Sequence, residues 1–124
     1  MLRDMTTPDD YVEMQVAAVG EGLTRVALAG RLDTTGVDRI ETRFGATVVS
    51  GGQNAIIDLS RVTFIGSMGI RMFITAARSM RPRQTRLAVY GAQSMVGDVF
   101  ESVSLKDVLP IVKTEADAIA AVTG

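Results

Sequence analysis

The stretch that decides the fold is residues 58–70, which read Asp58-Leu59-Ser60-Arg61-Val62-Thr63-Phe64-Ile65-Gly66-Ser67-Met68-Gly69-Ile70. The apolar run just before it predicts a central strand that is covered on both faces and ends at Asp58. A short loop with two large apolar residues then returns to the edge of the sheet. Ser67 opens a segment with helical periodicity that extends to Arg81. The stretch therefore predicts a strand, a loop and a helix, with Ser67 at the sheet edge.

Upstream of this unit, two alternating segments predict strands at residues 11–18 and 23–30. The turn Gly20-Glu21-Gly22 between them is short enough for an antiparallel hairpin. The same glycines resemble the start of a dinucleotide-binding motif, but the third glycine and the following helix are missing, so we interpret them as a turn. Apolar residues spaced by three and four then predict a helix that begins with Thr34 or Thr35 as its N-cap and ends at Gly51.

Downstream, strands and helices continue to alternate. We expect a strand over 86–91, a helix that Ser94 caps, a short edge strand over 108–112 and a final helix that Thr114 caps. This order predicts a single α/β domain over residues 11–124, with a mixed central sheet covered by about four helices. Residues 1–10 are polar and acidic, and we interpret them as a flexible N-terminal segment.

Composition excludes several classes of chemistry. The 124 residues include no His and no Cys, which excludes a Ser-His-Asp triad, a thiol nucleophile and a Zn–thiolate site. Thirteen Lys and Arg against 14 Asp and Glu give a formal net charge of -1, so we expect no nucleic-acid partner and no membrane partner. We expect no cofactor and no metal. With no signal peptide or spanning segment in the sequence, we expect a cytoplasmic protein.

Four groups of residues, in order along the chain, match one known family. They are Ala29-Gly30-Arg31-Leu32-Asp33, then Ile56-Ile57-Asp58-Leu59-Ser60 with Phe64-Ile65, then Val96, Val99, Phe100 and Leu105, and finally Glu115-Ala116. From Tyr11 onward the chain resembles a STAS domain, the family of bacterial anti-sigma factor antagonists and of related domains in stress signalling and transporter tails.

The resemblance implies a function for Ser67. In antagonists of this family, the serine that opens the second helix is phosphorylated by an anti-sigma factor that is also a serine kinase, and a serine phosphatase removes the phosphate. The unphosphorylated antagonist binds the kinase and frees the sigma factor. The family commonly has Asp-Ser-Ser-Gly at this site, whereas this chain has Gly66-Ser67-Met68-Gly69.

Helical periodicity suggests which residues face a partner. At about 100° per residue, Met68, Arg71, Met72 and Thr75 lie with Ser67 opposite the apolar side of Ile70, Phe73 and Ala77. Exposed methionine suits an adaptable binding surface, although both methionines could be ordinary semi-buried residues. Asp33 and Asp58 are expected near Ser67 and could help a kinase or phosphatase recognise it. The plain alternatives are that Ser67 is an N-cap and that the aspartates cap helices or bind loop amides.

The leading hypothesis from the sequence is a non-enzymatic anti-sigma factor antagonist, a switch controlled by phosphorylation of Ser67. Arg71, one turn along the helix, would pair with the phosphate or with a carboxylate of the partner. The alternative is a constitutive STAS scaffold or sensor module that assembles with other STAS proteins or a ligand. A hydrolase with Ser67 as nucleophile is disfavoured because no His, and no Lys close to Ser67 in the sequence, could act as its base.

Overall fold

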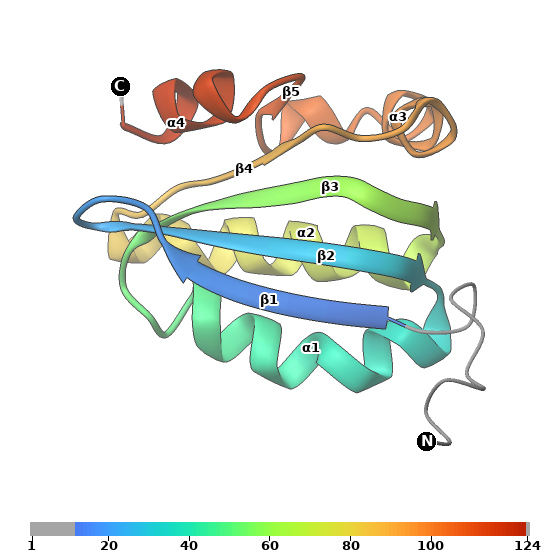
Figure 1. Ribbon diagram of the computed structural model, residues 1–124, viewed down its shortest axis with the longest axis horizontal. Helices are drawn as coiled ribbons and strands as arrows, with labels where there is room; N and C mark the ends of the chain where they lie inside the picture. Colours follow the sequence, from blue (N-terminus) through green and yellow to red (C-terminus); the bar gives the residue numbers. More distant parts are fainter. Residues whose placement is uncertain (1–11, 124) are drawn as a thin grey trace.

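The computed structural model describes residues 12–123 as one sheet with helices on both faces (Figure 1). Five strands and four α-helices alternate along the chain as the sequence predicts. In chain order they are β1 (Val12–Ala18), β2 (Leu23–Leu32), α1 (Thr34–Val48), β3 (Asn54–Ile65), α2 (Ser67–Met80), β4 (Leu87–Tyr90), α3 (Ser94–Ser102), β5 (Ile111–Val112) and α4 (Glu115–Thr123). Short 3₁₀ turns, η3 (Arg81–Arg83) and η4 (Leu105–Asp107), follow α2 and α3. The expected N-terminal segment, residues 1–10, lies outside the described residues.

The strands lie in the order β1-β2-β3-β4-β5, which is also their order in the chain (Figure 1). β1 pairs antiparallel with β2, and the three later pairs are parallel. The predicted hairpin is therefore confirmed, and so is the edge position of the short strand β5. Because each parallel crossover moves one strand in the same direction, right-handed connections place α1, α2 and α3 on one face of the sheet.

The larger core lies between these three helices and the sheet. Phe73 of α2 stands at its centre: its ring lies 5.7 Å from that of Phe44 in α1 and 6.5 Å from that of Phe100 in α3. All three rings are almost completely buried. Tilted and edge-on aromatic pairs at these distances add to the stability that burial provides. One side chain of α2 thus joins all three helices of this face.

Helix α4 covers the opposite face. Ala118 and Val122 pack there with Ile56, Ala88 and Tyr90 in a second, smaller core. Arg25 and Glu115 form an ion pair of 3.0 Å that joins β2 to the first residue of α4. The Thr114 hydroxyl accepts a hydrogen bond of 3.1 Å from the Asp117 amide, so the predicted cap of this helix is confirmed.

The backbone conformation of the turn between β1 and β2 explains why it contains two glycines. Gly20 and Gly22 have φ angles of 62° and 79°, in the left-handed region that glycine adopts without steric cost. The Val19 amide closes the turn by donating to the Leu23 carbonyl at 2.9 Å. The interpretation as a hairpin turn is therefore confirmed.

Two expected details are wrong. β3 does not end at Asp58 but continues to Ile65, and its register with β2 shifts twice, between the Ala27 and Ala29 pairs and between the Gly30 and Arg31 pairs. The predicted loop is thus an irregular continuation of the strand, because a bulge absorbs the residues that break the apolar pattern. The N-cap of α1 is Asp33, not Thr34 or Thr35, and the N-cap of α3 is Gln93, not Ser94.

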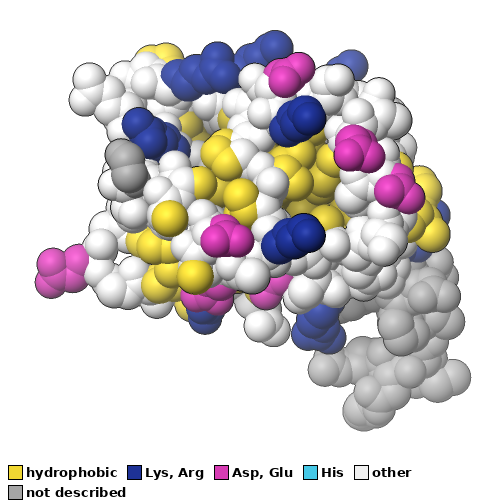
Figure 2. All heavy atoms as spheres, turned by 90° about the horizontal axis from the view of Figure 1, so that it is seen from above, with side chains coloured by type: hydrophobic (Ala, Val, Ile, Leu, Met, Phe, Trp, Pro, Cys, Tyr) yellow, Lys and Arg dark blue, Asp and Glu magenta, His cyan; other side chains and the backbone are white. Residues whose placement is uncertain are grey.

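Apolar side chains are partly exposed on the side of the molecule that carries α3, β5 and α4. Figure 2 shows that face, where apolar side chains gather at the centre and charged ones surround them. The partly buried apolar residues of this part of the chain include Val99, Val108, Ile111 and Val112. The short edge strand β5 therefore lies in a partly apolar surface.

Close packing at the start of α2 gives the first prediction. A Cβ atom at Gly69 would lie 2.8 Å from Ile65 Cγ1 and 3.1 Å from the Leu32 carbonyl oxygen. We expect Gly69→Ala to lower the free energy of unfolding by about 1–3 kcal/mol, because the backbone oxygen cannot yield as a flexible side chain would.

Gly45, in the last turn of α1, is the matched control. Nothing lies within 4 Å of a Cβ built there, so Gly45→Ala should raise the free energy of unfolding by about 0.4–1 kcal/mol. Urea denaturation of both variants measures the difference. A Gly69→Ala protein as stable as the parent would contradict the close approach.

Candidate functional site

Ser67 is the first residue of α2 and its side chain is exposed. The N-cap is Gly66, in extended conformation, and no side chain caps this helix start. The plain alternative, in which Ser67 itself is the N-cap, is therefore wrong. The first intrahelical hydrogen bond runs from the Ile70 amide to the Gly66 carbonyl at 3.1 Å. Because the first amides of a helix have no partner within it, the backbone next to the Ser67 hydroxyl can donate to an anion.

The end of β2 lies directly beside this helix start. The Gly66 amide donates to the Leu32 carbonyl at 3.0 Å, and Asp33 and Ser67 each follow one of these two residues. The predicted closeness of Asp33 to Ser67 is therefore confirmed. The same hydrogen bond holds the start of α2 against the carboxyl end of the sheet.

Both carboxylate oxygens of Asp33 are engaged. Oδ1 accepts from the Gly36 amide at 2.8 Å, which caps α1, and Oδ2 accepts from Arg31 Nε at 3.3 Å. The Gly36 hydrogen bond holds the pKa of Asp33 below its usual value, and Arg31 lowers that pKa further. The capping alternative is thus the structural role of Asp33, and its contribution to partner recognition stays a prediction.

Arg31 and Phe64 lie at the same edge of the sheet as Asp33 and Ser67. They are cross-strand partners in β2 and β3, and the Arg31 guanidinium lies 4.2 Å from the centre of the Phe64 ring. A Cβ atom built on Gly66 would lie 3.4 Å from the same ring. Phe64 therefore lies close to both Arg31 and Gly66, the residue that precedes Ser67. A cation over an aromatic face at this distance is favourable, and it keeps the guanidinium at the sheet edge.

The exposed stripe of α2 differs in part from the one expected. Ser67, Arg71 and Thr75 are exposed at four-residue spacing, and Met68 is half-buried against the larger core. These four positions agree with a surface that a partner could reach. Their roles in partner binding stay predictions, because no partner is present.

Met72 does not belong to this surface. Its side chain is 4% exposed and forms part of the larger core, so the expectation that it faces a partner is wrong. α1 packs beside α2, and Phe44, Met72, Ala76 and Thr75 line a shallow groove of about 280 Å³ between the two helices. The periodicity of one helix could not show that a second helix covers its flank.

Asp58 lies far from Ser67, so their expected closeness is wrong. β3 continues from Asp58 to Ile65, which spans about 20 Å at roughly 3.3 Å per residue. Asp58 pairs with Tyr90 at the end of β4, and its Oδ1 accepts from the Ser60 amide at 2.9 Å. Burial, together with the charges of Asp58 and Glu115, raises the pKa of Tyr90. Asp58 therefore belongs to a polar group on the α4 face.

The sequence did not single out two residues that the structure places in prominent positions. Arg31 is held at the edge by Asp33 and Phe64, but its cross-strand partner follows the register shift in β3 and could not be read from spacing. Met95, at the second position of α3, is 62% exposed, whereas Met72 is buried. Met95 lies directly before Val96, the first buried residue of α3.

None of the helices described here is long and apolar enough to cross a membrane. Within residues 12–123, acidic side chains do not gather in a group of three that could hold a metal ion.

A family model described as "STAS domain" matches residues 15–118. Among curated proteins, the chain is 26% identical over 101 residues to an anti-sigma factor antagonist of Bordetella bronchiseptica, BtrV, covering 82% of this chain and 87% of that protein. It is also similar to a solved anti-sigma factor antagonist from Mycobacterium paratuberculosis, with 25% identity and a TM-score of 0.85, covering 96% of this chain and 99% of the other.

The fold is further shared with the Bacillus cell fate determinant SpoIIAA, whose structure is known in the phosphorylated form. The TM-score is 0.66 at 21% identity, over 87% of this chain and 97% of that one. These likenesses confirm the predicted STAS fold, including the mixed sheet, the opening hairpin and the four helices.

The capping role of Asp33 predicts a specific pH dependence. Because its pKa is lowered on folding, its stabilising effect is present above the ordinary carboxyl pKa and is lost as the pH falls through the folded pKa. Asp33→Ala should therefore lower the free energy of unfolding by about 1 kcal/mol at neutral pH, and by less in acid.

Asp33→Asn is the matched variant, because an asparagine can cap a helix but does not titrate. It should keep most of the stability and flatten the acid limb of the stability profile. Urea denaturation between pH 3 and 7 measures both effects. An Asp33→Ala protein that loses the same stability at every pH would contradict the assignment.

Proposed function

The chain belongs to the STAS domain family, and from that premise we propose that it is an anti-sigma factor antagonist controlled by phosphorylation of Ser67. It binds an anti-sigma factor that is also a serine kinase, and this binding frees a sigma factor. A serine phosphatase resets the switch. In this role the protein carries out no chemistry of its own and acts in the cytoplasm.

The observation that carries the proposal is the exposed Ser67 hydroxyl at an uncapped helix start. A kinase can reach this hydroxyl without unfolding any part of the protein. The relatives named as anti-sigma factor antagonists support the assignment, and the phosphorylated form of SpoIIAA supports the choice of a phosphate as the signal for this fold.

A phosphate on Ser67 adds nearly two negative charges where the helix can accept them. The amides of Ser67, Met68 and Gly69 precede the first intrahelical hydrogen bond, so they can donate to phosphate oxygens. The helix dipole also favours a negative charge at this end. Phosphorylation should therefore leave the fold nearly unchanged, and its effect falls on the partner.

The half-buried Met68 and the exposed Arg71 and Thr75 form the surface that meets the partner. A phosphate among them opposes binding because the new charge must lose its water when the partner covers it. Arg71, one turn after Ser67, binds a carboxylate of the partner before phosphorylation and the phosphate afterwards. The phosphate and the partner's carboxylate thus compete for the Arg71 guanidinium, and this competition weakens binding further.

Gly66 favours the second candidate, a constitutive STAS scaffold or sensor module. The family commonly has an aspartate before the serine, and here glycine replaces it although the site has room for a side chain. A kinase that reads this acid would not modify the chain. Recovery of other STAS proteins, and of no kinase, in a pull-down would support this second function.

The direct test is phosphorylation in vitro. We expect incubation with the anti-sigma serine kinase of the same organism and ATP to add one phosphate to the protein. Peptide mass spectrometry should place it on Ser67, and Ser67→Ala should remove it. An unchanged mass, or modification of another residue, would overturn the proposal.

Charge at the site gives a second test, by calorimetric titration of the same kinase. Ser67→Asp and Arg71→Glu should each weaken binding by tenfold or more, since a desolvated like charge costs at least about 1.4 kcal/mol. Arg83→Glu, an equal charge change in η3 outside α2, is the control and should leave the affinity unchanged. Normal binding by Ser67→Asp would rule out the repulsion mechanism.

A further inference from the structure

The free edge of β1 is a second place where this fold can receive a partner. Among the strands of residues 12–123, β1 pairs only with β2, so its other side is an edge of the described sheet. After Met14, all four residues of β1 are exposed, including Val16 at 42%. A strand edge offers unpaired backbone donors and acceptors to another chain. α1 shields the first half of β1 and leaves the second half open.

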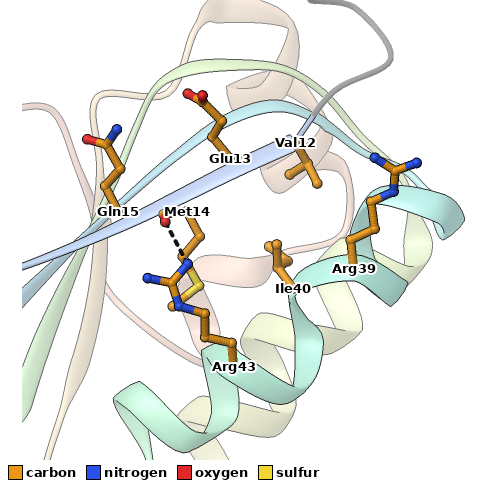
Figure 3. Close-up of a pocket in the computed structure, with 7 residues that line it drawn as sticks. All are labelled: Val12, Glu13, Met14, Gln15, Arg39, Ile40 and Arg43. Carbon is orange, nitrogen blue, oxygen red and sulfur yellow. Dashed lines mark hydrogen bonds between the residues drawn. The ribbon is translucent and has the colours of Figure 1, made fainter. Parts of the chain in front are cut away.

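A groove runs along this edge. It has a volume of about 390 Å³ and lies between Val12–Gln15 of β1 and three residues of α1, Arg39, Ile40 and Arg43. Figure 3 shows the strand on one side and the helix on the other, with both arginines on the helix side. Arg43 Nη1 donates to the Met14 carbonyl at 2.9 Å across the groove.

This hydrogen bond shows which backbone groups face outward. In an antiparallel pair, alternate residues of a strand turn their amide and carbonyl groups toward the partner strand or away from it. Since the Met14 carbonyl reaches Arg43 on α1, the backbone groups of Val12 and Val16 also face the free edge. Three alternate residues can thus pair with an added strand, and Arg43 occupies only one of their carbonyls.

The charge of the groove selects the kind of added strand. Arg39 and Arg43 lie one helical turn apart, and both are exposed along the α1 side. Glu13, the acid that lines the groove, extends from β1 away from both arginines (Figure 3). A strand laid along β1 would therefore direct every second side chain toward two guanidinium groups.

We propose that this groove binds an extended acidic segment of another protein, which pairs with the free edge of β1. Its carboxylates meet Arg39 and Arg43 while its backbone pairs with Val12 and Val16, so the main chain provides affinity and alternate side chains provide specificity. When the segment binds, Arg43 exchanges the neutral Met14 carbonyl for a carboxylate, which is a stronger, charge-assisted acceptor.

A second copy of this chain fits the groove less well. If two β1 edges paired, the side chains turned toward the α1 arginines would be Val12, Met14 and Val16, which carry no negative charge. The groove also lies on the flank of α1 opposite the one that packs against α2, where Phe44 and Gly45 line a separate groove. The acidic segment, on the flank of α1 away from α2, and the partner of the Ser67 surface, on α2, can therefore bind independently.

The experiment uses a fluorescent nine-residue peptide in which glutamate alternates with valine, titrated with the full protein and followed by anisotropy. We expect Arg39→Glu to weaken binding about tenfold, and Arg83→Glu, the same charge change outside the groove, to leave it unchanged. A peptide with lysine in place of glutamate should bind at least tenfold more weakly. Because Arg39 and Arg83 are both exposed, the folds of these variants should be intact.

A second peptide tests the strand pairing itself. N-methylation of alternate backbone amides removes the donors that pair with β1 but keeps every carboxylate, and it should abolish binding. Equal binding by the methylated peptide, or an Arg39→Glu variant that binds normally, would overturn the proposal. Self-association of the protein that competes with the acidic peptide would assign the edge to a second copy and would overturn it as well.

Discussion

The close approach of α2 to the end of β2 is the constraint on which the rest of the site depends. Gly69 lies against Leu32 and Ile65 with no room for a Cβ atom, and the Gly66 amide binds the Leu32 carbonyl. Together these contacts fix where α2 begins and therefore where Ser67 stands. The same helix carries Phe73, which joins the three helices of one face. A rigid core thus presents one hydroxyl at a defined position.

The side chains near the Ser67 hydroxyl are engaged in contacts with one another and with the backbone. Asp33 uses both carboxylate oxygens to hold α1 and Arg31, and Arg31 in turn lies over Phe64. These groups bind one another, and the chain contains no histidine or cysteine that could act as a general base or thiol nucleophile. The free helix amides at Ser67 then matter more than any side chain, because they can receive a phosphate with little structural change.

Sequence patterns predicted the order of the elements, the opening hairpin and the start of α2, since each depends on local periodicity and turn residues. They failed where the answer depended on a neighbouring element. Met72 is buried because α1 covers it, and Asp58 is remote because a bulge lets β3 continue to Ile65. The pairing of Arg31 with Phe64 depends on the same register. The local sequence pattern thus predicted where each helix and strand lies along the chain. Tertiary packing decided which of their side chains are exposed.

The central claim is that a phosphate on Ser67 changes the affinity for the partner and not the fold. Calorimetric titration of the kinase with purified phosphorylated and unphosphorylated protein tests this claim most directly, with circular dichroism and thermal unfolding of both forms as a check. We expect the two forms to unfold alike and the phosphorylated form to bind at least tenfold more weakly. Equal affinity of the two forms, or loss of binding that comes with loss of structure, would contradict this account.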